Sequence, residues 1–128
     1  MKLLLDTHTF IWWDSEPQRL SLQVLNMCQG PENELLVSVA SLWEMQIKLQ
    51  LGKLKLNTPL AELVSGQQEI NKIDILDVKL EHVLALGRLP SHHKDPFNRL
   101  LIAQADIEEA ILVSKDQIFT EYEVKLVW

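Results

Sequence analysis

The sequence predicts an α/β fold, a three-layer sandwich of helices around a mostly parallel central sheet. Two observations support this prediction. Short apolar runs such as residues 3–5 and 35–37 alternate along the chain with longer segments of helical periodicity. Each short run is apolar throughout, which is typical of strands covered on both faces. The chain of 128 residues has the length of one domain, so we expect residues 1–128 to form a single unit.

The individual elements follow from the apolar runs and from Gly, Pro and capping residues between them. Strands are predicted where short apolar runs occur, at residues 2–5, 35–37, 73–75, 110–113 and 124–127. Helices are predicted where apolar residues recur at helical spacing, at residues 7–13, 20–29, 38–51 and 97–109. Pro59 opens a further helix and Asp77 caps another, while the His- and Pro-rich segment 88–94 is predicted as a loop.

Composition limits the classes of function. With 18 acidic and 12 basic residues the net charge is -6, so the chain lacks the basic excess of a protein that binds nucleic acid by bulk charge. To bind a polyanion, the chain would need a local binding feature, such as carboxylates that hold divalent cations. Cys28 is the single cysteine, which excludes an internal disulfide and suits a reducing compartment. We expect a cytoplasmic protein without a membrane span or signal peptide.

Acidic residues occupy positions where a parallel sheet binds its ligands. Asp6 follows the first strand, Asp116 follows the fourth, and Glu44 lies about two turns into the helix after the second. Asp95 and Asn98 begin another helix. Carboxylates gathered at one sheet edge repel each other, and Mg²⁺ or Mn²⁺ relieves that repulsion with an all-oxygen ligand set. We therefore expect Asp6, Glu44 and Asp116 to converge, with pKa values raised by mutual repulsion.

Each acid also has a purely structural interpretation. Asp6 and Asp95 fit helix N-caps, Asp116 fits a turn, and Glu44 fits a solvated helix face. Other polar and aromatic residues are interpreted as structural. His92 and His93 are interpreted as loop residues. Lys48 and Lys53 are interpreted as surface charges unless a pocket reaches them. The aromatic residues of the core or an interface are Trp12, Trp13, Trp43 and Trp128.

Segments spread along the chain resemble one family. In order they read LLLDTHTFIWW, SVASLWEMQIKLQLGKL, HKDPFNRLLIAQA and ILVSKD. Together they resemble a PIN-domain protein, specifically the VapC-type toxin of bacterial toxin-antitoxin pairs. The resemblance implies a PIN-like sandwich and a Mg²⁺- or Mn²⁺-dependent endoribonuclease that hydrolyses RNA with a metal-activated water. It also implies a dimer or higher oligomer and inhibition by a cognate antitoxin.

The resemblance assigns roles to individual residues. Asp6 matches the first acid of the family, Glu44 the second and Asp116 the last. Ser114 matches the hydroxyl residue found two places before that last acid, and we expect it to contact the substrate. Asp6, Glu44 and Asp116 are expected to be both catalytic and metal-binding, with Asp95 as a further catalytic residue and Asn98 as a further metal ligand.

The third acid departs from the family pattern. Relatives read DPFDR where this chain has Asp95-Pro96-Phe97-Asn98-Arg99, so Asn98 stands at the position of the pocket acid. Asparagine can coordinate a cation through its carbonyl oxygen but brings no charge. Asp95 lies on nearly the same helix face and is the alternative third catalytic acid. Arg99 is expected to hold a backbone phosphate, with a surface salt bridge as its alternative role.

The sequence is also compatible with two other functions. One is a degenerate PIN domain that binds an antitoxin or RNA without turnover because of Asn98. Another is a phosphatase, suggested by Asp6-Thr7-His8-Thr9 although His8 stands where a second acid belongs. The apolar residues 10–13, Phe10, Ile11, Trp12 and Trp13, also predict that some surface of this helix meets a second chain.

Overall fold

The central sheet is parallel and contains five strands in the order β3-β2-β1-β4-β5. The computed structural model describes residues 1–92 and 94–128. Every strand pairing in the described sheet is parallel. The strands are β1 (Lys2–Leu5), β2 (Glu34–Ser38), β3 (Asp74–Leu76), β4 (Ile111–Val113) and β5 (Leu126–Val127). The predicted α/β class with a mostly parallel sheet is therefore confirmed.

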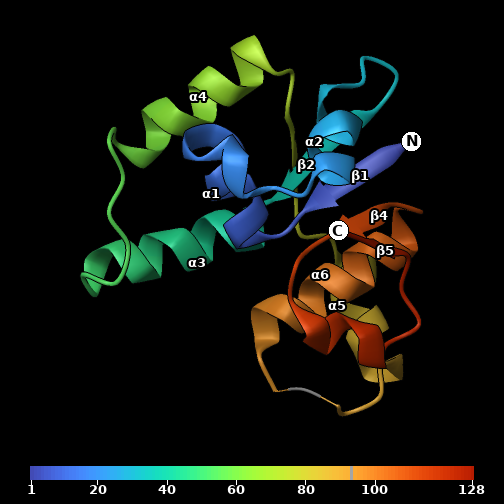
Figure 1. Cartoon of the computed structure of the whole chain (residues 1–128). Helices are drawn as coiled ribbons and strands as arrows, with labels where there is room; N and C mark the ends of the chain where they lie inside the picture. Colours follow the sequence, from blue (N-terminus) through green and yellow to red (C-terminus); the bar gives the residue numbers. More distant parts are fainter. Residues whose placement is uncertain (93) are drawn as a thin grey trace.

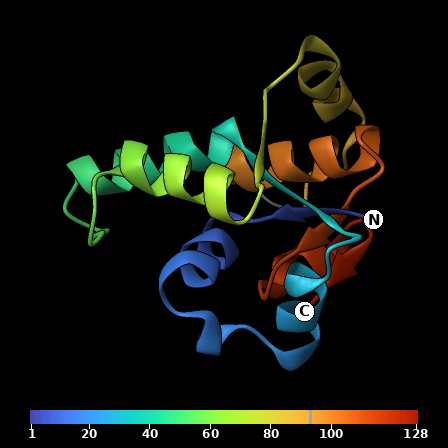
Figure 2. The ribbon, with the colours of Figure 1, turned by 90° about the horizontal axis from the view of Figure 1, so that it is seen from above.

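Helices cover both faces of this sheet and complete the three layers. Figure 2 shows α1 and α2 on one side and α6 on the other, with α5 outside α6. In Figure 1, α3 and α4 extend beyond the sheet. The helices are α1 (Thr7–Ser15), α2 (Leu22–Gln29), α3 (Val39–Gln50), α4 (Leu60–Ile70), α5 (Leu80–Ala85) and α6 (Pro96–Ile107). Short 3₁₀ turns are η1 (Pro17–Arg19), η2 (Leu86–Arg88) and η3 (Gln117–Glu121).

The central strand β1 is buried on both faces. Leu3 and Leu5 belong to one apolar cluster, and Leu4 belongs to the other. The first cluster includes Phe10 of α1, and the second includes Leu101 of α6. Because successive strand residues point to opposite faces, an unbroken apolar run is what a doubly covered strand requires.

The start of α5 differs from the prediction. Asp77 was expected to cap this helix, but its N-cap position is Lys79. The side chain of His82 provides the cap instead, because its Nδ1 accepts the Lys79 backbone N–H at 2.9 Å. The carbonyl of Asp77 accepts a hydrogen bond from Gln104 Nε2 at 3.3 Å, which connects this loop to α6.

The predicted apolar surface at residues 10–13 is only partly open. Phe10 is fully buried, and Ile11, Trp12 and Trp13 are half-buried against the first apolar cluster. The predicted loop 88–94 overlaps the last residue of η2, Arg88, and its residue His93 lies outside the described residues. No helix within the described parts of the chain is both long and apolar enough to cross a membrane.

Candidate active site

The strand order creates a crevice between the carboxyl ends of β1 and β4. From β1 the chain adds β2 and then β3 on one side, and it later places β4 on the other side of β1. Parallel sheets bind ligands at such a change of direction. Asp6 directly follows β1 there, and its backbone N–H donates to the carbonyl of Val113, the last residue of β4, at 3.1 Å.

A serine joins two of the predicted acids at this crevice. The Ser114 hydroxyl donates to Asp6 Oδ2 at 2.5 Å and accepts the Asp116 backbone N–H at 3.0 Å. Ser114 is 2% exposed. Its hydroxyl therefore links Asp6 to the start of the Asp116 segment, so the structure gives it a positioning contact in addition to the predicted substrate contact.

Asp6 is also a helix cap, as its structural interpretation predicts, and Asp116, which was interpreted as a turn residue, caps a short 3₁₀ turn. Asp6 Oδ1 accepts the backbone N–H of Thr9 at 2.9 Å, at the N-cap of α1. Asp116 Oδ1 accepts the backbone N–H of Ile118 at 3.1 Å, at the start of η3. Capping and membership of the site therefore coexist, because each cap fixes one carboxylate oxygen at a strand end.

A hollow of about 250 Å³ opens beside these acids. It is lined by Asp6, His8, Trp12, Lys115 and Asp116. The sequence interpretation had placed only the two acids here. The signal that could have added Lys115 and His8 is their position in the sequence, one and two residues from the strand-end acids Asp116 and Asp6. We refer to this as the acidic hollow.

Burial raises the pKa of Asp6, while hydrogen bonds from Ser114 and Thr9 and the nearby charge of His8 act in the opposite direction. Asp6 is only 8% exposed, and desolvation of its carboxylate is the largest cause of the raised pKa. The expected cause, repulsion between neighbouring carboxylates, is not what raises this pKa. A buried carboxylate of this kind is stabilised in its charged form by a cation placed next to it.

Glu44 approaches the same region from α3. Its Oε1 accepts the Thr7 hydroxyl at 2.6 Å, and its Oε2 pairs with Lys48 Nζ at 3.0 Å. The Glu44 side chain is 16% exposed, so it does not lie on a solvated helix face. Because Thr7 directly follows Asp6, the hydrogen bond to Thr7 fixes Glu44 near the crevice.

Asp95 lies with Glu44 on a second hollow, of about 520 Å³, between α3 and the start of α6. Its Oδ1 accepts the backbone N–H groups of Phe97 at 2.9 Å and Asn98 at 3.2 Å. The capping interpretation of Asp95 is therefore correct. The lining of this hollow consists of Glu44, Ile47, Lys48, Leu51, Lys53, Lys94, Asp95, Pro96 and Phe97.

Asn98 and Arg99 are half-buried in the first turn of α6. Within the described part of the chain, neither residue belongs to the lining of the two hollows above. Arg99 donates from Nη1 to the Pro90 carbonyl at 2.8 Å and from Nη2 to the Leu86 carbonyl at 3.4 Å. These bonds connect α6 to the preceding loop, and phosphate binding by Arg99 stays a prediction.

A different group of residues, Glu81, His82 and Glu108, brings its potential ligand atoms within 4.8 Å of one another among the described residues. His82 Nδ1 accepts the Lys79 N–H, so the ring proton is on Nε2, which donates to Glu108 Oε2 at 2.9 Å. A cation at Nε2 would have to displace this proton. The contact between His82 and Glu108 is better explained as a link between α5 and the end of α6.

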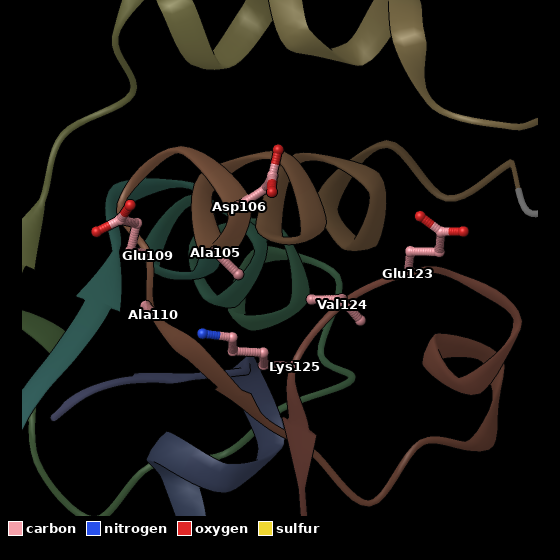
Figure 3. A pocket seen from close by; sticks show the side chains of 7 residues that line it. All are labelled: Ala105, Asp106, Glu109, Ala110, Glu123, Val124 and Lys125. Atoms are coloured by element: carbon pink, nitrogen blue, oxygen red, sulfur yellow. The ribbon is translucent and has the colours of Figure 1, made fainter.

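A larger hollow, about 630 Å³, lies at the opposite edge of the sheet (Figure 3). Its residues Ala110 and Lys125 precede β4 and β5, so they mark the amino ends of the strands. Figure 3 shows the carboxylates of Asp106, Glu109 and Glu123 spread around it. Size therefore does not identify the site, because the predicted acids are at the carboxyl ends.

The predicted acids offer the oxygen ligands of a hard divalent cation, but only two of them share one hollow, because Glu44 lines the second hollow. Asp6 and Asp116 share the acidic hollow, and Glu44 is held nearby through Thr7. All three offer carboxylate oxygens, which Mg²⁺ and Mn²⁺ prefer. Fold and site together define an α/β domain with an acidic crevice where the order of a parallel sheet changes direction.

The sequence matches the PIN domain over residues 3–125, and the chain belongs to this family. Ribonuclease VapC22 of Mycobacterium tuberculosis (strain ATCC 25618 / H37Rv) is 29% identical over 116 residues, which cover 90% of this chain and 87% of that protein.

Solved structures show the same fold. VapBC2 from Rickettsia felis, bound to a DNA fragment from their promoter, has a TM-score of 0.75 at 17% identity, over 99% of this chain and 98% of that chain. DNA-bound VapBC from Salmonella typhimurium has a TM-score of 0.66 at 15% identity, over 99% and 97%. The predicted membership of the PIN family is thus confirmed.

Proposed function

We propose that this protein is a metal-dependent endoribonuclease, the toxin of a toxin-antitoxin pair, and that it acts in the cytoplasm. The observation that supports this most strongly is the linkage of Asp6 to the Asp116 segment through Ser114, where β1 and β4 end. The similarity to Ribonuclease VapC22 supports RNA as the substrate. The solved VapBC relatives support an antitoxin partner.

Asp6, Glu44 and Asp116 would hold Mg²⁺ or Mn²⁺, with Asn98 as a further, uncharged oxygen ligand. When bound, such a cation neutralises charge developing on a phosphate and lowers the pKa of a coordinated water. Asp95 stays in the proposed catalytic set only as an indirect contributor, because its bonded carboxylate oxygen caps α6.

The chain's own side chains prepare this site for a phosphate. Ser114 orients Asp6, and the Thr7 hydroxyl orients Glu44. Lys48 offsets the charge of Glu44 through their 3.0 Å ion pair. Lys115 lines the acidic hollow and offers a cation to an incoming phosphate. Substrate contact by Ser114 is secondary in this scheme, because its hydroxyl already bonds Asp6.

The test is cleavage of a labelled mixed-sequence RNA in Mn²⁺, with and without a chelator. We expect cleavage that the chelator abolishes, and no cleavage by Asp6→Asn or Asp116→Asn. Asp106→Asn is the matched control, because Asp106 is an exposed acid at the opposite sheet edge. Cleavage by Asp6→Asn at the wild-type rate would contradict the proposal.

A degenerate domain that binds without turnover is the second candidate, and the observation that favours it is Asn98. The capping role of Asp95 adds to this, because Asp95 does not simply replace the missing acid. Calorimetric binding of Mn²⁺ without RNA cleavage would support this candidate. Preferential hydrolysis of a small phosphomonoester would instead support a phosphatase.

Self-association is a further part of the proposal. Ile11, Trp12 and Trp13 pack on their own core but retain some exposed surface. Leu84 on α5 is more exposed, at 63%. Light scattering gives the mass of the purified chain alone, which tests self-association. The same measurement with a co-expressed antitoxin tests formation of the complex. A monomer that binds no antitoxin would contradict this part.

A further inference from the structure

The second hollow, between α3 and the start of α6, has the chemistry of a nucleic-acid subsite. We propose that it binds single-stranded RNA, with phosphates over Lys53 and Lys94 and one unpaired base stacked on Trp43. This inference rests on the proposed function and extends it to how the substrate is held. We refer to the hollow as the lysine hollow.

Positive charge is concentrated in the lysine hollow. Lys48, Lys53 and Lys94 all line it, although the whole chain has only 12 Lys and Arg and a net charge of -6. Lys48 is paired with Glu44, whereas Lys53 and Lys94 are exposed. Exposed lysines attract the phosphates of a nucleic-acid backbone. These two lysines lie on the same hollow as Glu44, a predicted catalytic acid.

The acids of the lysine hollow leave these two cations available to a ligand. Glu44 accepts the Thr7 hydroxyl and pairs with Lys48, and Asp95 caps α6. The hollow is therefore not simply an acidic surface, even though it contains two carboxylates. Its three lysines outnumber its two carboxylates, and this small excess of positive charge favours an anion.

The turn after α3 fixes the position of Lys53. Gly52 has a φ of +72°, a left-handed conformation that glycine adopts without steric cost. The Lys53 backbone N–H then donates to the Lys48 carbonyl at 2.8 Å, which closes the end of the helix. The two lysines are thus held at the same end of α3.

Trp43 supplies an aromatic surface at the rim. It is 62% exposed, so the core alternative of its sequence interpretation is wrong, and the interface alternative stays a prediction. Its ring packs edge-on against the ring of Phe97, a residue that lines the hollow. The two ring centroids are 5.2 Å apart, and the angle between the ring planes is 80°. Trp43, Ile47 and Leu51 recur at helical spacing, so Trp43 lies on the α3 face that lines the hollow.

An aromatic ring next to lysines is the combination that binds single strands. Bases stack on aromatic side chains while the backbone follows positive charge. A base must be unpaired to stack there, so duplex RNA is a poor ligand. Glu44 belongs to both the lysine hollow and the predicted catalytic set, so RNA held here would lead toward the acidic crevice.

The test measures binding of a fluorescein-labelled, unstructured oligoribonucleotide by anisotropy in EDTA, which separates binding from cleavage. We expect Trp43→Ala to weaken binding about fivefold or more and Trp43→Phe to retain most of it. The double variant Lys53→Ala/Lys94→Ala should lower the salt-dependence slope by about 0.7 for each lost contact. Lys125→Ala, at the opposite sheet edge, is the control and should bind as the wild type does.

Wild-type affinity in both Trp43→Ala and the double-lysine variant would overturn the subsite, whether or not Mn²⁺-dependent cleavage persists. A wild type that shows Trp43-dependent binding but never cleaves RNA would sustain the subsite and overturn the proposed function. Unchanged RNA binding with a reduced oligomer mass in Trp43→Ala would assign the surface to a second copy and overturn the inference. Circular-dichroism melting of each variant ensures that folded proteins are compared.

Discussion

The side chain of Asp6 shows how one residue serves the fold and the site together. One carboxylate oxygen caps α1 through Thr9, and the other accepts the Ser114 hydroxyl. Burial raises its pKa above the ordinary value of 3.8, so the folded chain holds the charged form at a cost. Folding stability therefore decreases as pH rises from the unfolded pKa to the higher folded pKa, and a bound cation would offset that loss.

Asp6→Asn should remove RNA cleavage without a large loss of stability. Asparagine is as good an N-cap as aspartate, and its neutral amide is less costly to bury than a charge. We expect the free energy of unfolding in urea at pH 7 to change by less than about 1 kcal/mol, whereas Asp6→Ala should lose about 1 kcal/mol. The prediction is wrong if Asp6→Asn is the less stable of the two variants.

Cys28 should be unreactive in the folded protein. Burial raises the pKa of its thiol to about 11, so little thiolate is present at pH 8. Iodoacetamide should modify Cys28 slowly in buffer and rapidly in denaturing urea, as followed by mass spectrometry. Equal rates in the two conditions would show that the thiol is accessible and ionised in the folded state.

Among the elements, α6 connects the capping motif to the missing acid. Its N-cap is Asp95, Pro96 occupies the first turn, and Asn98 lies in the same turn. The helix therefore begins one residue before its predicted start, with the predicted cap at Asp95. Because a cap and a metal ligand both need carboxylate oxygens, α6 is the element where stability and metal affinity can be separated by substitution.

Asn98→Asp should increase Mn²⁺ affinity at least about tenfold, or about 1.4 kcal/mol, by analogy with the effects of altered ligand shells. Asp95→Asn should instead cost mainly stability, on the order of 1 kcal/mol or less, through a weakened cap. Calorimetric titration and urea unfolding separate the two effects. If Asn98→Asp changes nothing while Asp95→Asn abolishes metal binding, then Asp95 is the third ligand.

The contact between α5 and α6 should depend on pH through Glu108. The hydrogen bond from His82, followed by the charges of Lys79, His82 and Lys2, holds the pKa of Glu108 below its ordinary value of 4.5 despite partial desolvation. Its contribution to stability is therefore present above pH 4.5 and is lost as pH falls through the lower folded pKa.

Unfolding free energies of the wild type and Glu108→Gln, measured from pH 6 downward, test this link. The advantage of the wild type should shrink as the solution becomes more acidic than the unfolded pKa. A difference between the two proteins that stays constant through this acid range would show that the Glu108 charge does not stabilise the contact. Glu109→Gln is a suitable control, because Glu109 is exposed beside the same helix end.

For the whole molecule, Mn²⁺ should stabilise the fold through the carboxyl edge of the sheet. A ligand that binds only the native state adds stability that grows with its concentration, about 2.7 kcal/mol at a hundred times its dissociation constant. Thermal unfolding with and without Mn²⁺ should show a rise in Tm that Asp116→Asn largely removes and Asp106→Asn retains. An equal rise in Asp116→Asn would place the metal elsewhere.

Local patterns along the chain determined most of the fold and the positions of the acids. Apolar runs predicted the strands, and Asp6 and Asp95 were recognisable as caps because a cap depends on a few neighbouring residues. A parallel sheet then brings the residues that follow its strands to one edge. The sequence also shows directly that asparagine stands at position 98, where the family pattern has an acid, because this difference is one of residue identity.

Only the tertiary structure decided how these residues meet and what surrounds them. The Ser114 contact with Asp6 joins residues 108 positions apart, and the Thr7 contact with Glu44 joins residues 37 apart. Burial as the cause of the raised Asp6 pKa, the replacement of Asp77 by His82 as a cap, and the exposure of Trp43 likewise depend on neighbouring elements. Periodicity shows which face of a helix is apolar, but packing between elements decides which side chains remain open to a ligand.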